Sequence, residues 1–308
     1  MRRTILIFLA AAFSGSTLAQ QGKELLVYAV KGKATAVYQN ISFPLKIGKV
    51  LQPGTVITTE KDASLTLLCQ QGKPISVSQA GQFPLSKWKD SCSTGTAHTV
   101  SGNYFRYIWQ QLYANSPEHK EEKRRQNNLA VSRGESQGTV PAKSQRGIQF
   151  KPGMDTVYDD GSSFPLSWTA PVNTGPYFFT LLDANGKKAV YRDTVRSPFI
   201  AIDSFRHLLK EGNTYRWTVG ARGMKTSRSR ILRVVGPEKG RRLLEQCLLP
   251  TVFEEEPAAQ CLRVAYTLEK NHYLGAALSW YSQAAEKGGE ETFFQEQLTR
   301  FRNDYWIR

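Results

Sequence analysis

The stretch LKIGKVLQPGTVITTEKDASLTLLC, residues 45–69, alternates apolar and polar residues in two short runs. Leu65, Leu67 and Cys69 are spaced two apart, so they fall on one face of an extended chain, as a half-buried β-strand requires. Gly48 and Gly54 precede the first run, and turns favour a residue without a Cβ atom. The stretch therefore predicts strands of a β-sheet, and folding alone accounts for its pattern.

Strand signals continue on both sides of this stretch. The predicted strands are residues 25–30, 34–38, 56–59, 64–69 and 74–78. Glycines at positions 32, 48, 54, 72 and 81 fall between them. Together these signals predict a β-rich domain over residues 23–90.

The segments VKGKATAV, LKIGKVLQPGTVITTEKDASLTLL and QGKPISV, in this order, resemble the FecR-type domain of bacterial envelope proteins. Thr55, Thr59 and Gln71 depart from the family pattern, in which an acid, a Gly and an Asp are common at these places. The resemblance covers about 65 residues, about a fifth of the chain. The positions that carry it are Gly48, Leu51, Gly54, Ile57, Thr58, Leu65, Leu67 and Gly72.

The FecR-type resemblance implies a bacterial envelope protein, and the family supplies no catalytic residues to look for. Its better-known members relay signals across an inner membrane through a cytoplasmic segment and a membrane helix. The sequence shows neither feature, so we do not expect a relay role.

The first residues predict a secretory signal peptide over residues 1–19. Arg2 and Arg3 precede an apolar run at 5–13, which is too short to cross a bilayer, and small residues lead to Ala19. No later stretch reaches the apolar length of a membrane helix. We therefore expect an exported chain, periplasmic or secreted, with no transmembrane segment after signal cleavage.

The chain is strongly basic, with a formal net charge of +15. Removal of the signal peptide would take away two Arg and no acid, which leaves +13. Such a balance favours anionic partners, namely nucleic acid, acidic polysaccharide or a lipid surface, and export argues against nucleic acid. The alternative is ordinary solvated charge, because the basic residues are scattered along the sequence.

Four cysteines in an exported chain predict disulfides. Four cysteines allow three connectivities. Proximity in the sequence favours the pairs Cys69–Cys92 and Cys247–Cys261. No Cys-x-x-Cys spacing occurs, so neither a redox centre nor a zinc site is indicated.

Residues 91–147 predict a short helix followed by a basic linker. In the helical part, YFRYIWQQLY, the apolar residues Phe105, Ile108, Trp109 and Leu112 recur at helical spacing. This helix either binds a membrane surface or a partner, or packs back on the sheet, and we favour packing. The following residues, up to 147, are polar, charged and poor in aromatics, which predicts a flexible linker.

Residues 148–236 predict a β-sandwich. Asn185-Gly186 separates the strand-like runs PYFFTLLD and KKAVYRDTV, which is a hairpin signal with positive φ expected at both turn residues. The spacing of Leu209, Gly212 and Tyr215 resembles a tyrosine corner. The block as a whole resembles a fibronectin type III or immunoglobulin-like domain, with Trp168 and Trp217 between its sheets.

Residues 237–308 predict four helices. Val264, Ala265, Leu268, Leu274, Ala277, Tyr281 and Ala284 resemble a single tetratricopeptide repeat; a generic helical hairpin explains the same pattern. A lone repeat cannot bury its own face, so the flanking helices must cover it. The chain is thus predicted to be multidomain and mainly β, with a FecR-like β domain, a central β-sandwich and C-terminal helical hairpins.

No constellation of nucleophile, base or metal ligands emerges from the sequence. His98, His119, His207 and His272 are scattered, and the acids at 155, 159 and 160 lack calcium-loop spacing and suit a turn. We therefore expect neither enzymatic activity nor a cofactor nor a metal.

The remaining expectation is a modular envelope protein that binds a protein partner through a groove between its C-terminal helices. The alternative is a carbohydrate- or peptidoglycan-binding accessory protein that uses exposed aromatics. Tyr177, Trp217 and Trp280 are the candidate binding residues.

The predicted linker leads to a proteolysis test. Residues 117–147 combine low hydrophobicity with dense Lys and Arg, so limited trypsin digestion should cut there first and leave a stable C-terminal fragment. Mass spectrometry of the fragments measures the cleavage sites. Early cleavage within residues 160–235, with 117–147 intact, would contradict the predicted boundaries.

Overall fold

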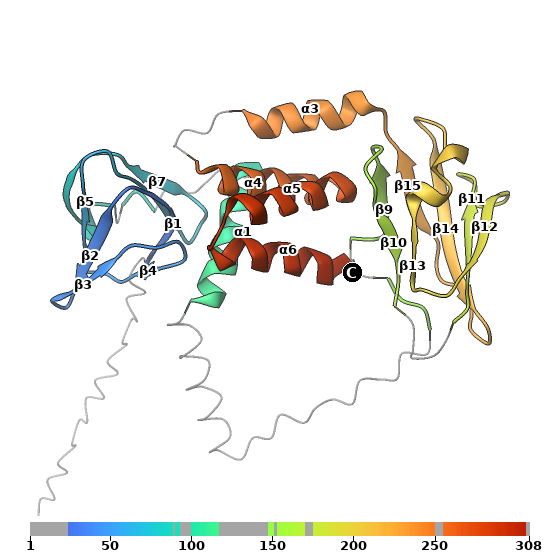
Figure 1. Cartoon of the computed structure of the whole chain (residues 1–308), viewed down its shortest axis with the longest axis horizontal. Coiled ribbons are helices and arrows are strands. Elements are labelled where there is room, and N and C mark those ends of the chain that lie inside the picture. The colour runs from blue at the N-terminus through green and yellow to red at the C-terminus, as the bar shows by residue number, and fades with distance from the viewer. Residues whose placement is uncertain are drawn as a thin grey trace, which may run out of the picture.

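The computed structural model describes residues 24–88, 90–92, 100–116, 147–150, 153–169, 175–249 and 255–305. The predicted signal peptide, linker residues 117–146, His98 and His119 lie outside the described residues. Figure 1 shows three units in a row: an N-terminal β unit, a set of helices and a second β unit. The chain order differs from this spatial order, because the C-terminal helices lie between the two β units. Among the described residues, helix accounts for 33% and strand for 32%, with the helices mostly C-terminal, so the β content predicted to dominate is matched by helix.

The N-terminal β unit consists of two four-stranded antiparallel sheets, with strand orders β4-β1-β6-β7 and β3-β2-β5-β8. All five strands expected from the sequence form. The three additional strands are two to four residues long, too short for a clear alternation. The strands are β1 (Leu25–Lys31), β2 (Ala34–Tyr38), β3 (Ile41–Pro44), β4 (Val50–Leu51), β5 (Val56–Thr59), β6 (Ser64–Cys69), β7 (Pro74–Val77) and β8 (Gly81–Pro84).

The core of this β unit confirms the alternation of the quoted stretch. Leu65, Leu67 and Cys69 point into one apolar cluster together with Ile57. Cys69 forms a disulfide with Cys92, with a Cα–Cα distance of 5.6 Å, as predicted. The disulfide ties the end of β6 to the segment that leaves the unit.

Helix α1 (Val100–Asn115) covers the outer face of β1 and β6. Phe105, Ile108 and Trp109 are buried there, which confirms the prediction of a helix that packs back on the sheet. The same cover makes the half-buried description of β6 wrong. Leu68, on the face opposite Leu67, is also fully buried.

The turn between β6 and β7 packs directly against α1. Gly72 in this turn has φ +84°, and a Cβ atom there would lie 2.6 Å from the carbonyl oxygen of Gly102 and 2.7 Å from the amide nitrogen of Arg106. Only a glycine combines this conformation with so close an approach. The turn glycine predicted from sequence therefore also sets the distance between sheet and helix.

The second β unit pairs a five-stranded sheet, ordered β12-β11-β14-β15-β9, with a two-stranded sheet of β10 and β13. β15 and β9 are parallel and the other neighbours are antiparallel. Trp168 and Trp217 are buried in its core, as predicted. The strands are β9 (Thr156–Asp159), β10 (Pro165–Ser167), β11 (Tyr177–Leu182), β12 (Ala189–Val195), β13 (Phe199–Ala201), β14 (Thr214–Ala221) and β15 (Arg230–Val234).

Two local predictions for this unit have different outcomes. The hydroxyl of Tyr215 accepts a hydrogen bond from the backbone N–H of Lys210 at 2.9 Å, which is the expected tyrosine-corner contact. The hairpin between β11 and β12 also forms, but positive φ at both turn residues is wrong. Only Gly186 has it, because the connection spans six residues and the Asp183 carboxylate accepts from the N–H of Lys187 at 2.9 Å.

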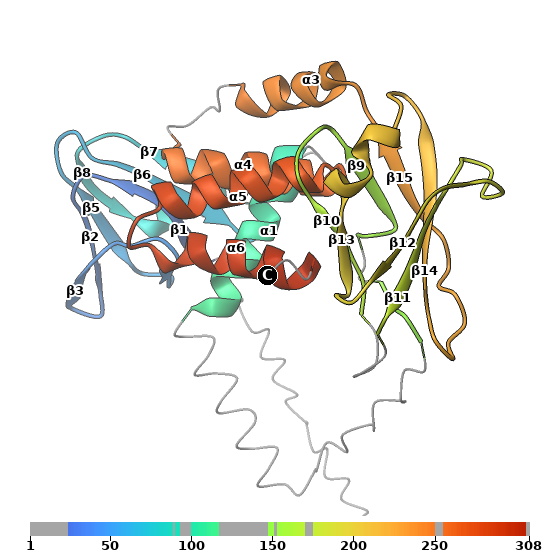
Figure 2. The same cartoon turned by 45° about the vertical axis from the view of Figure 1, so that its right-hand side comes forward.

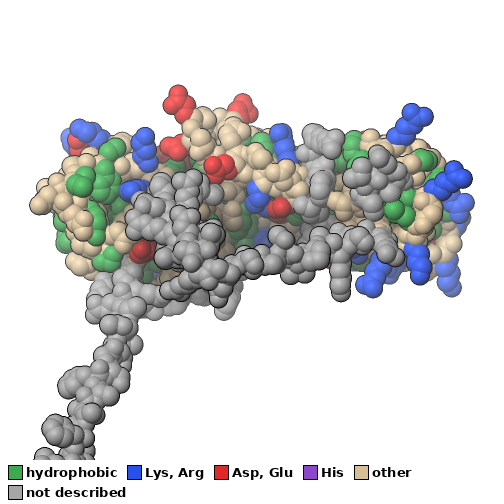
Figure 3. Space-filling view, turned by 90° about the horizontal axis from the view of Figure 1, so that it is seen from below, with side chains coloured by type: hydrophobic (Ala, Val, Ile, Leu, Met, Phe, Trp, Pro, Cys, Tyr) green, Lys and Arg blue, Asp and Glu red, His purple; other side chains and the backbone are tan. Residues whose placement is uncertain are grey.

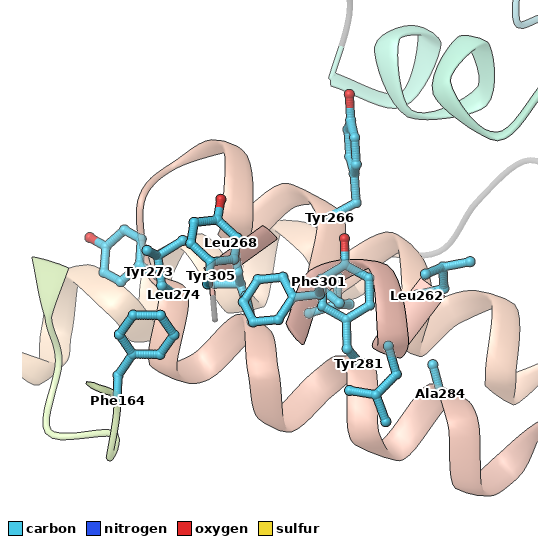
Figure 4. Packing of buried hydrophobic residues seen from close by; sticks show 14 of the residues in the cluster. Phe164, Leu262, Tyr266, Leu268, Tyr273, Leu274, Tyr281, Ala284, Phe301 and Tyr305 are labelled. Carbon is cyan, nitrogen blue, oxygen red and sulfur yellow. The ribbon is translucent and has the colours of Figure 1, made fainter. Parts of the chain in front are cut away.

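The four predicted C-terminal helices are α3 (Pro237–Leu248), α4 (Pro257–Lys270), α5 (Leu274–Lys287) and α6 (Thr292–Tyr305). α4 and α5 form a tight hairpin, and α3 and α6 cover it on either side. Ala277 and Ala284 allow the close approach, and Tyr281 is fully buried against Phe301 with ring centroids 4.9 Å apart (Figure 4). The expected cover by flanking helices is confirmed.

The predicted disulfide between Cys247 and Cys261 is wrong, because both thiols are free and buried. Burial raises the pKa of both thiols, and a neighbour that opposes this shift is Thr267 for Cys247 and Lys287 for Cys261. Thr267 lies six residues beyond Cys261 on α4, about 9 Å along the axis and on another face. Proximity in sequence therefore did not place the two thiols together.

A buried polar cluster joins the N-terminal β unit to the helices. Arg263 of α4 and Glu255 form an ion pair at 2.8 Å, with side chains only 8% and 5% exposed. The Tyr28 hydroxyl of β1 donates to Glu255 at 3.0 Å and lies 3.1 Å from the hydroxyl of Tyr104 in α1. Arg263 also donates to the carbonyl of Cys247 at 2.6 Å. The cluster thus connects β1, α1, α3 and α4.

The opposite end of the helices joins the second β unit. The hydroxyl of Ser167 in β10 donates to the backbone carbonyl of Tyr305 at 2.5 Å in a buried contact. The backbone N–H of Tyr158 in β9 donates to the carbonyl of His272 at 3.0 Å. Phe164 lies edge-on to the Tyr305 ring, as the close-up in Figure 4 shows. One continuous apolar cluster consequently runs through all three units.

Within the described ranges, no helix has both the length and the apolar character needed to cross a membrane.

The buried ion pair gives a stability prediction. Arg263→Met should lower the free energy of unfolding by about 3–5 kcal/mol, because it leaves the Glu255 carboxylate buried without a countercharge. The control is Arg241→Met, which breaks the exposed pair with Glu238 and should cost about 1 kcal/mol or less. Denaturant unfolding measures both values. Equal losses in the two variants would contradict the role of burial.

A candidate binding groove along α1

Three neighbouring cavities follow the outward face of α1 and share lining residues. The first, about 440 Å³, lies between α1 and the end of α4, and the second, about 440 Å³, lies between α1 and the N-terminal β unit. Arg106 and Gln110 line both of them. A third cavity, about 390 Å³, adjoins the first at Lys270 and reaches α6. We call the three together the α1 groove.

The groove lining is polar and aromatic and carries charges of both signs, with the acids Glu24, Glu269 and Asp304 in the second and third cavities. Besides the residues that the cavities share, the first is lined by Asn103, Tyr107, Tyr266, Thr267 and Asn271. The second is lined by Glu24, Gln70, Trp109, Tyr113 and Ala114, and the third by Gly153, Glu269, His272, Arg300, Asp304 and Tyr305.

Helical periodicity explains why α1 can line the groove and still pack on the sheet. Asn103, Arg106 and Gln110 recur at spacings of three and four, so they share the face opposite the buried Phe105 and Ile108. Figures 1 and 2 show α1 crossing the other helices beside the N-terminal β unit. The outward face of α1 therefore forms the base of the groove, with the N-terminal β unit on one side and α4 on the other.

Stacked aromatic pairs stiffen the groove. Tyr107 of α1 stacks on Tyr266 of α4 with centroids 4.6 Å apart, and Trp109 stacks on Tyr113 at 5.9 Å. The Tyr107 hydroxyl donates to the Gln297 side chain of α6 at 2.6 Å. α1 thus contacts both α4 and α6, and the groove shape depends on this packing.

Arg300 carries a charge that is already neutralised within the protein. Its guanidinium pairs with Glu269 and with Asp304, each at 2.8 Å, and donates to the Tyr281 hydroxyl at 2.8 Å. It also lies 5.6 Å from the centre of the Tyr107 ring. The terminal nitrogens of Arg300 are therefore paired at this end of the groove, whereas its buried Nε has no hydrogen-bond partner among the described residues.

Arg106 and Lys270 are different, because neither forms an ion pair with an acid among the described residues. Among the described residues, the Arg106 guanidinium hydrogen-bonds only to the side-chain oxygen of Asn103, at 3.4 Å. Lys270 is exposed and its ammonium lies 5.5 Å from the centre of the Tyr266 ring. These two cations face the same cavity and can receive negative charge from a ligand.

Burial raises the pKa of the tyrosines around this network. It raises the pKa of Tyr107 and of Tyr305 above their ordinary values, and the charge of Glu269 adds to the effect while Arg300 opposes it. Burial likewise raises the pKa of Tyr281 well above its ordinary value. These hydroxyls remain protonated and act as hydrogen-bond donors.

Two of the three candidate binding residues are buried, and for Trp217 this agrees with its predicted place between the sheets. Tyr177 is 7% exposed and Trp217 is fully buried, because both lie on the inner face of the five-stranded sheet. Trp280 of α5 is half-buried and packs against the core. The structure does not bring these three residues together, and none lines the α1 groove.

The remaining polar residues singled out from sequence have ordinary surroundings. Asp159 pairs with Arg206 at 3.1 Å, and Asp160 accepts from the N–H of Ser162 at 3.0 Å, which confirms the turn interpretation. His207 lies in a short 3₁₀ turn and His272 follows α4. Within the described ranges, no three His, Cys, Asp or Glu side chains gather as metal ligands.

Sequence reasoning missed the groove residues and Glu255. The aromatic and basic character of YFRYIWQQLY was the only available signal, and it did not show that Arg106 faces outward while Tyr107 reaches α6. An acid just before a helix commonly favours the start of that helix through the helix dipole, and nothing in the sequence gives Glu255 another role. The structure instead places it in the buried cluster with Arg263 and Tyr28.

The buried tyrosines give a pH prediction. Tyr28, Tyr104, Tyr107, Tyr281 and Tyr305 all have a raised pKa in the folded chain, whereas in the unfolded chain they ionise near pH 10. The unfolded state releases these protons first, so the free energy of unfolding should fall by roughly 1.4 kcal/mol per tyrosine for each pH unit above 10. Below pH 10 these groups should contribute no pH dependence.

Denaturant unfolding across this pH range, together with tyrosinate absorbance, measures the effect. Tyr107→Phe is the control variant. It removes one ionisable group, so the slope of the free energy of unfolding against pH should lose the contribution of one tyrosine. Ionisation of all tyrosines near pH 10 in the folded chain would contradict the prediction.

These geometric features are the basis for a functional assignment, because neither a known protein family nor a curated protein matches this chain.

Proposed function

We propose that this chain is a non-enzymatic binding or scaffold protein of the bacterial envelope, and that the α1 groove receives an extended, acidic segment of a protein partner. The observation that carries the proposal is a continuous groove in which Arg106 and Lys270 have no acidic partner among the residues that the structure describes. Carboxylates of a ligand would supply the missing countercharge.

The other groove residues suit an extended peptide. Gln110 and Asn103 are exposed amides that can hydrogen-bond to a backbone, and Tyr113 offers an aromatic face. A peptide that lies along the groove would contact the N-terminal β unit at Gln70 and the helices at Lys270. Both walls would therefore contribute to specificity.

The helical unit alone is a poorer candidate for the contact. The tetratricopeptide-like hairpin was expected to present a groove between its helices. α1 packs across α4 and α6, through the contacts of Tyr107 with Tyr266 and Gln297. The chain thus covers this surface with its own helix, and the groove that remains is built partly from α1.

Several features support an envelope location. The signal-like residues 1–19 and the FecR-like pattern both favour it, and the disulfide between Cys69 and Cys92 suits an oxidising compartment. The facing sheets of the N-terminal unit and the tyrosine-corner contact of Tyr215 are compatible with the FecR-like and fibronectin-like assignments. We place the chain in the periplasm or outside the cell on these grounds.

The experiment uses a photo-cross-linking amino acid in place of Gln110, which is exposed and lines two cavities. In cells, mass spectrometry should identify cross-linked peptides from acidic segments of one or few envelope proteins. Arg106→Glu combined with Lys270→Glu should reduce the product about tenfold or more, because both charges then repel the ligand.

The matched control reverses two exposed charges elsewhere, Lys46→Glu with Arg302→Glu, and should leave the product unchanged. A cross-linker at the exposed Lys61 of the N-terminal β unit controls for random encounters. Equal products in the groove and control variants would overturn the proposal. A cross-linked glycan instead of a peptide would favour the carbohydrate-binding alternative. Two of the residues predicted for that alternative, Tyr177 and Trp217, are buried in the core.

A further inference from the structure

The outer face of the five-stranded sheet in the second β unit is uncovered over β12, β11 and β14, whereas at the β9 edge the Tyr158 ring packs edge-on against Tyr273. Strand alternation sends Phe179, Leu181 and Trp217 into the core and their neighbours outward. The outward residues of the five strands are Thr156, Tyr158, Phe178, Thr180, Leu182, Ala189, Arg192, Thr194, Thr214, Arg216, Thr218, Gly220, Ile231 and Arg233. Threonine and arginine dominate this face, and it contains no carboxylate.

The three outward arginines have only neutral partners among the described residues. Arg216 donates to the carbonyl of Ala184 at 3.0 Å and lies 3.4 Å from the Ser229 hydroxyl. Arg233 contacts the Thr214 hydroxyl at 3.4 Å and lies over the Tyr158 ring at 5.7 Å. None of the ion pairs among the described residues includes Arg192, Arg216 or Arg233.

Strand register places the arginines on a diagonal across the sheet. Arg192 is in register with Thr180 and Thr218, and Arg216 is two residues further along β14. Arg233 pairs with Thr214, another two residues along. With strands about 4.8 Å apart and about 3.4 Å per residue, the arginine Cα atoms are separated by about 12 Å and about 8 Å.

Further basic residues flank this face. Lys187 and Lys188 lie in the β11–β12 turn, and Arg222, Lys225 and Arg228 lie between β14 and β15. The nearest acid in these turns, Asp183, is already hydrogen-bonded to the backbone of its own turn, which lowers its pKa. Figure 3 shows Lys and Arg side chains gathered over the sandwich end of the molecule, whereas Asp and Glu lie mostly over the middle.

We propose that this outer sheet face binds a linear acidic polysaccharide, with the arginines pairing with carboxylates along the polymer and the threonines hydrogen-bonding to sugar hydroxyls. Arginine suits this role because its planar guanidinium can bind a carboxylate through two hydrogen bonds. Phe178, which is 47% exposed, provides one apolar surface for a sugar ring. This site is separate from the α1 groove and independent of the function proposed for it.

Two other polyanion classes fit the face less well. Single-stranded nucleic acid is bound by several stacking aromatics, and this face exposes one phenylalanine and a tyrosine already covered by Arg233. A lipid surface requires apolar side chains that insert between headgroups, whereas Phe178 stands among threonines. A diagonal row of arginines flanked by hydroxyl groups can instead bind the carboxylates and hydroxyls of an extended polysaccharide.

The test measures binding of the full chain to polygalacturonate, with neutral dextran, phosphatidylglycerol vesicles and single-stranded DNA as parallel probes. We expect binding to polygalacturonate that weakens as salt increases, and none to dextran. Replacement of Arg192, Arg216 and Arg233 by Gln should weaken binding about tenfold or more.

The matched control replaces Lys46, Lys61 and Arg302 by Gln, which removes the same charge from other exposed sites and should have little effect. Circular dichroism establishes that both triple variants remain folded. The proposal is overturned if the two triple variants bind alike, if polygalacturonate does not bind at low salt, or if vesicles or DNA bind more tightly at equal charge concentration.

Discussion

The ion pair between Arg263 and Glu255 is the contact on which the arrangement of this protein depends. Water is excluded from both side chains, so each must find its partners within the protein. Glu255 does so through Arg263 and the Tyr28 hydroxyl, and Tyr104 lies beside Tyr28. These contacts require β1, α1 and the start of α4 to meet in one geometry. Apolar packing alone would tolerate small shifts between them, whereas unpaired buried charge does not.

Helix α1 links this arrangement to the α1 groove, because its inner face packs in the core and its outer face lines the groove. Its inner face completes the cover of β1 and β6, and it reaches α6 through the Tyr107 hydroxyl. Its outer face, with Arg106 and Gln110, is consequently held at a constant distance from Gln70 on one side and Lys270 on the other. The groove is thus a product of the interface between units, and neither the β unit nor the helical hairpin would form it alone.

The distribution of charge separates two surfaces of different character. Around α6, Arg300 is neutralised by Glu269 and Asp304, and the remaining cations of the groove are few and specifically placed. On the outer sheet face of the second β unit, arginines stand among threonines without any acid. A few placed charges suit recognition of one segment, whereas a row of charges suits a repetitive polymer. The net charge of +15 alone does not distinguish these situations.

The sequence by itself determined the features that depend on neighbouring residues. Alternation in residues 45–69 predicted β5 and β6, helical spacing predicted α1 and the four C-terminal helices, and the spacing of Gly212 and Tyr215 predicted the tyrosine-corner contact. The pairing of Cys69 with Cys92 was also predicted correctly, although the same argument from sequence proximity failed for Cys247 and Cys261. Such features follow from local backbone geometry and the period of the apolar pattern.

Tertiary structure decided which face each element buries, and against what. Alternation showed that Tyr177 and Trp217 lie on one face of their strands, but only the packing of the second sheet made that face the core. The two thiols of Cys247 and Cys261 stay apart because α3 meets a face of α4 that does not carry Cys261. The position of Glu255 before α4 would suit a helix-start acid, but its contacts with Arg263 and Tyr28 come from the tertiary structure. A periodic pattern defines a face, whereas the partner of that face lies far away in the sequence, so its position depends on the whole fold.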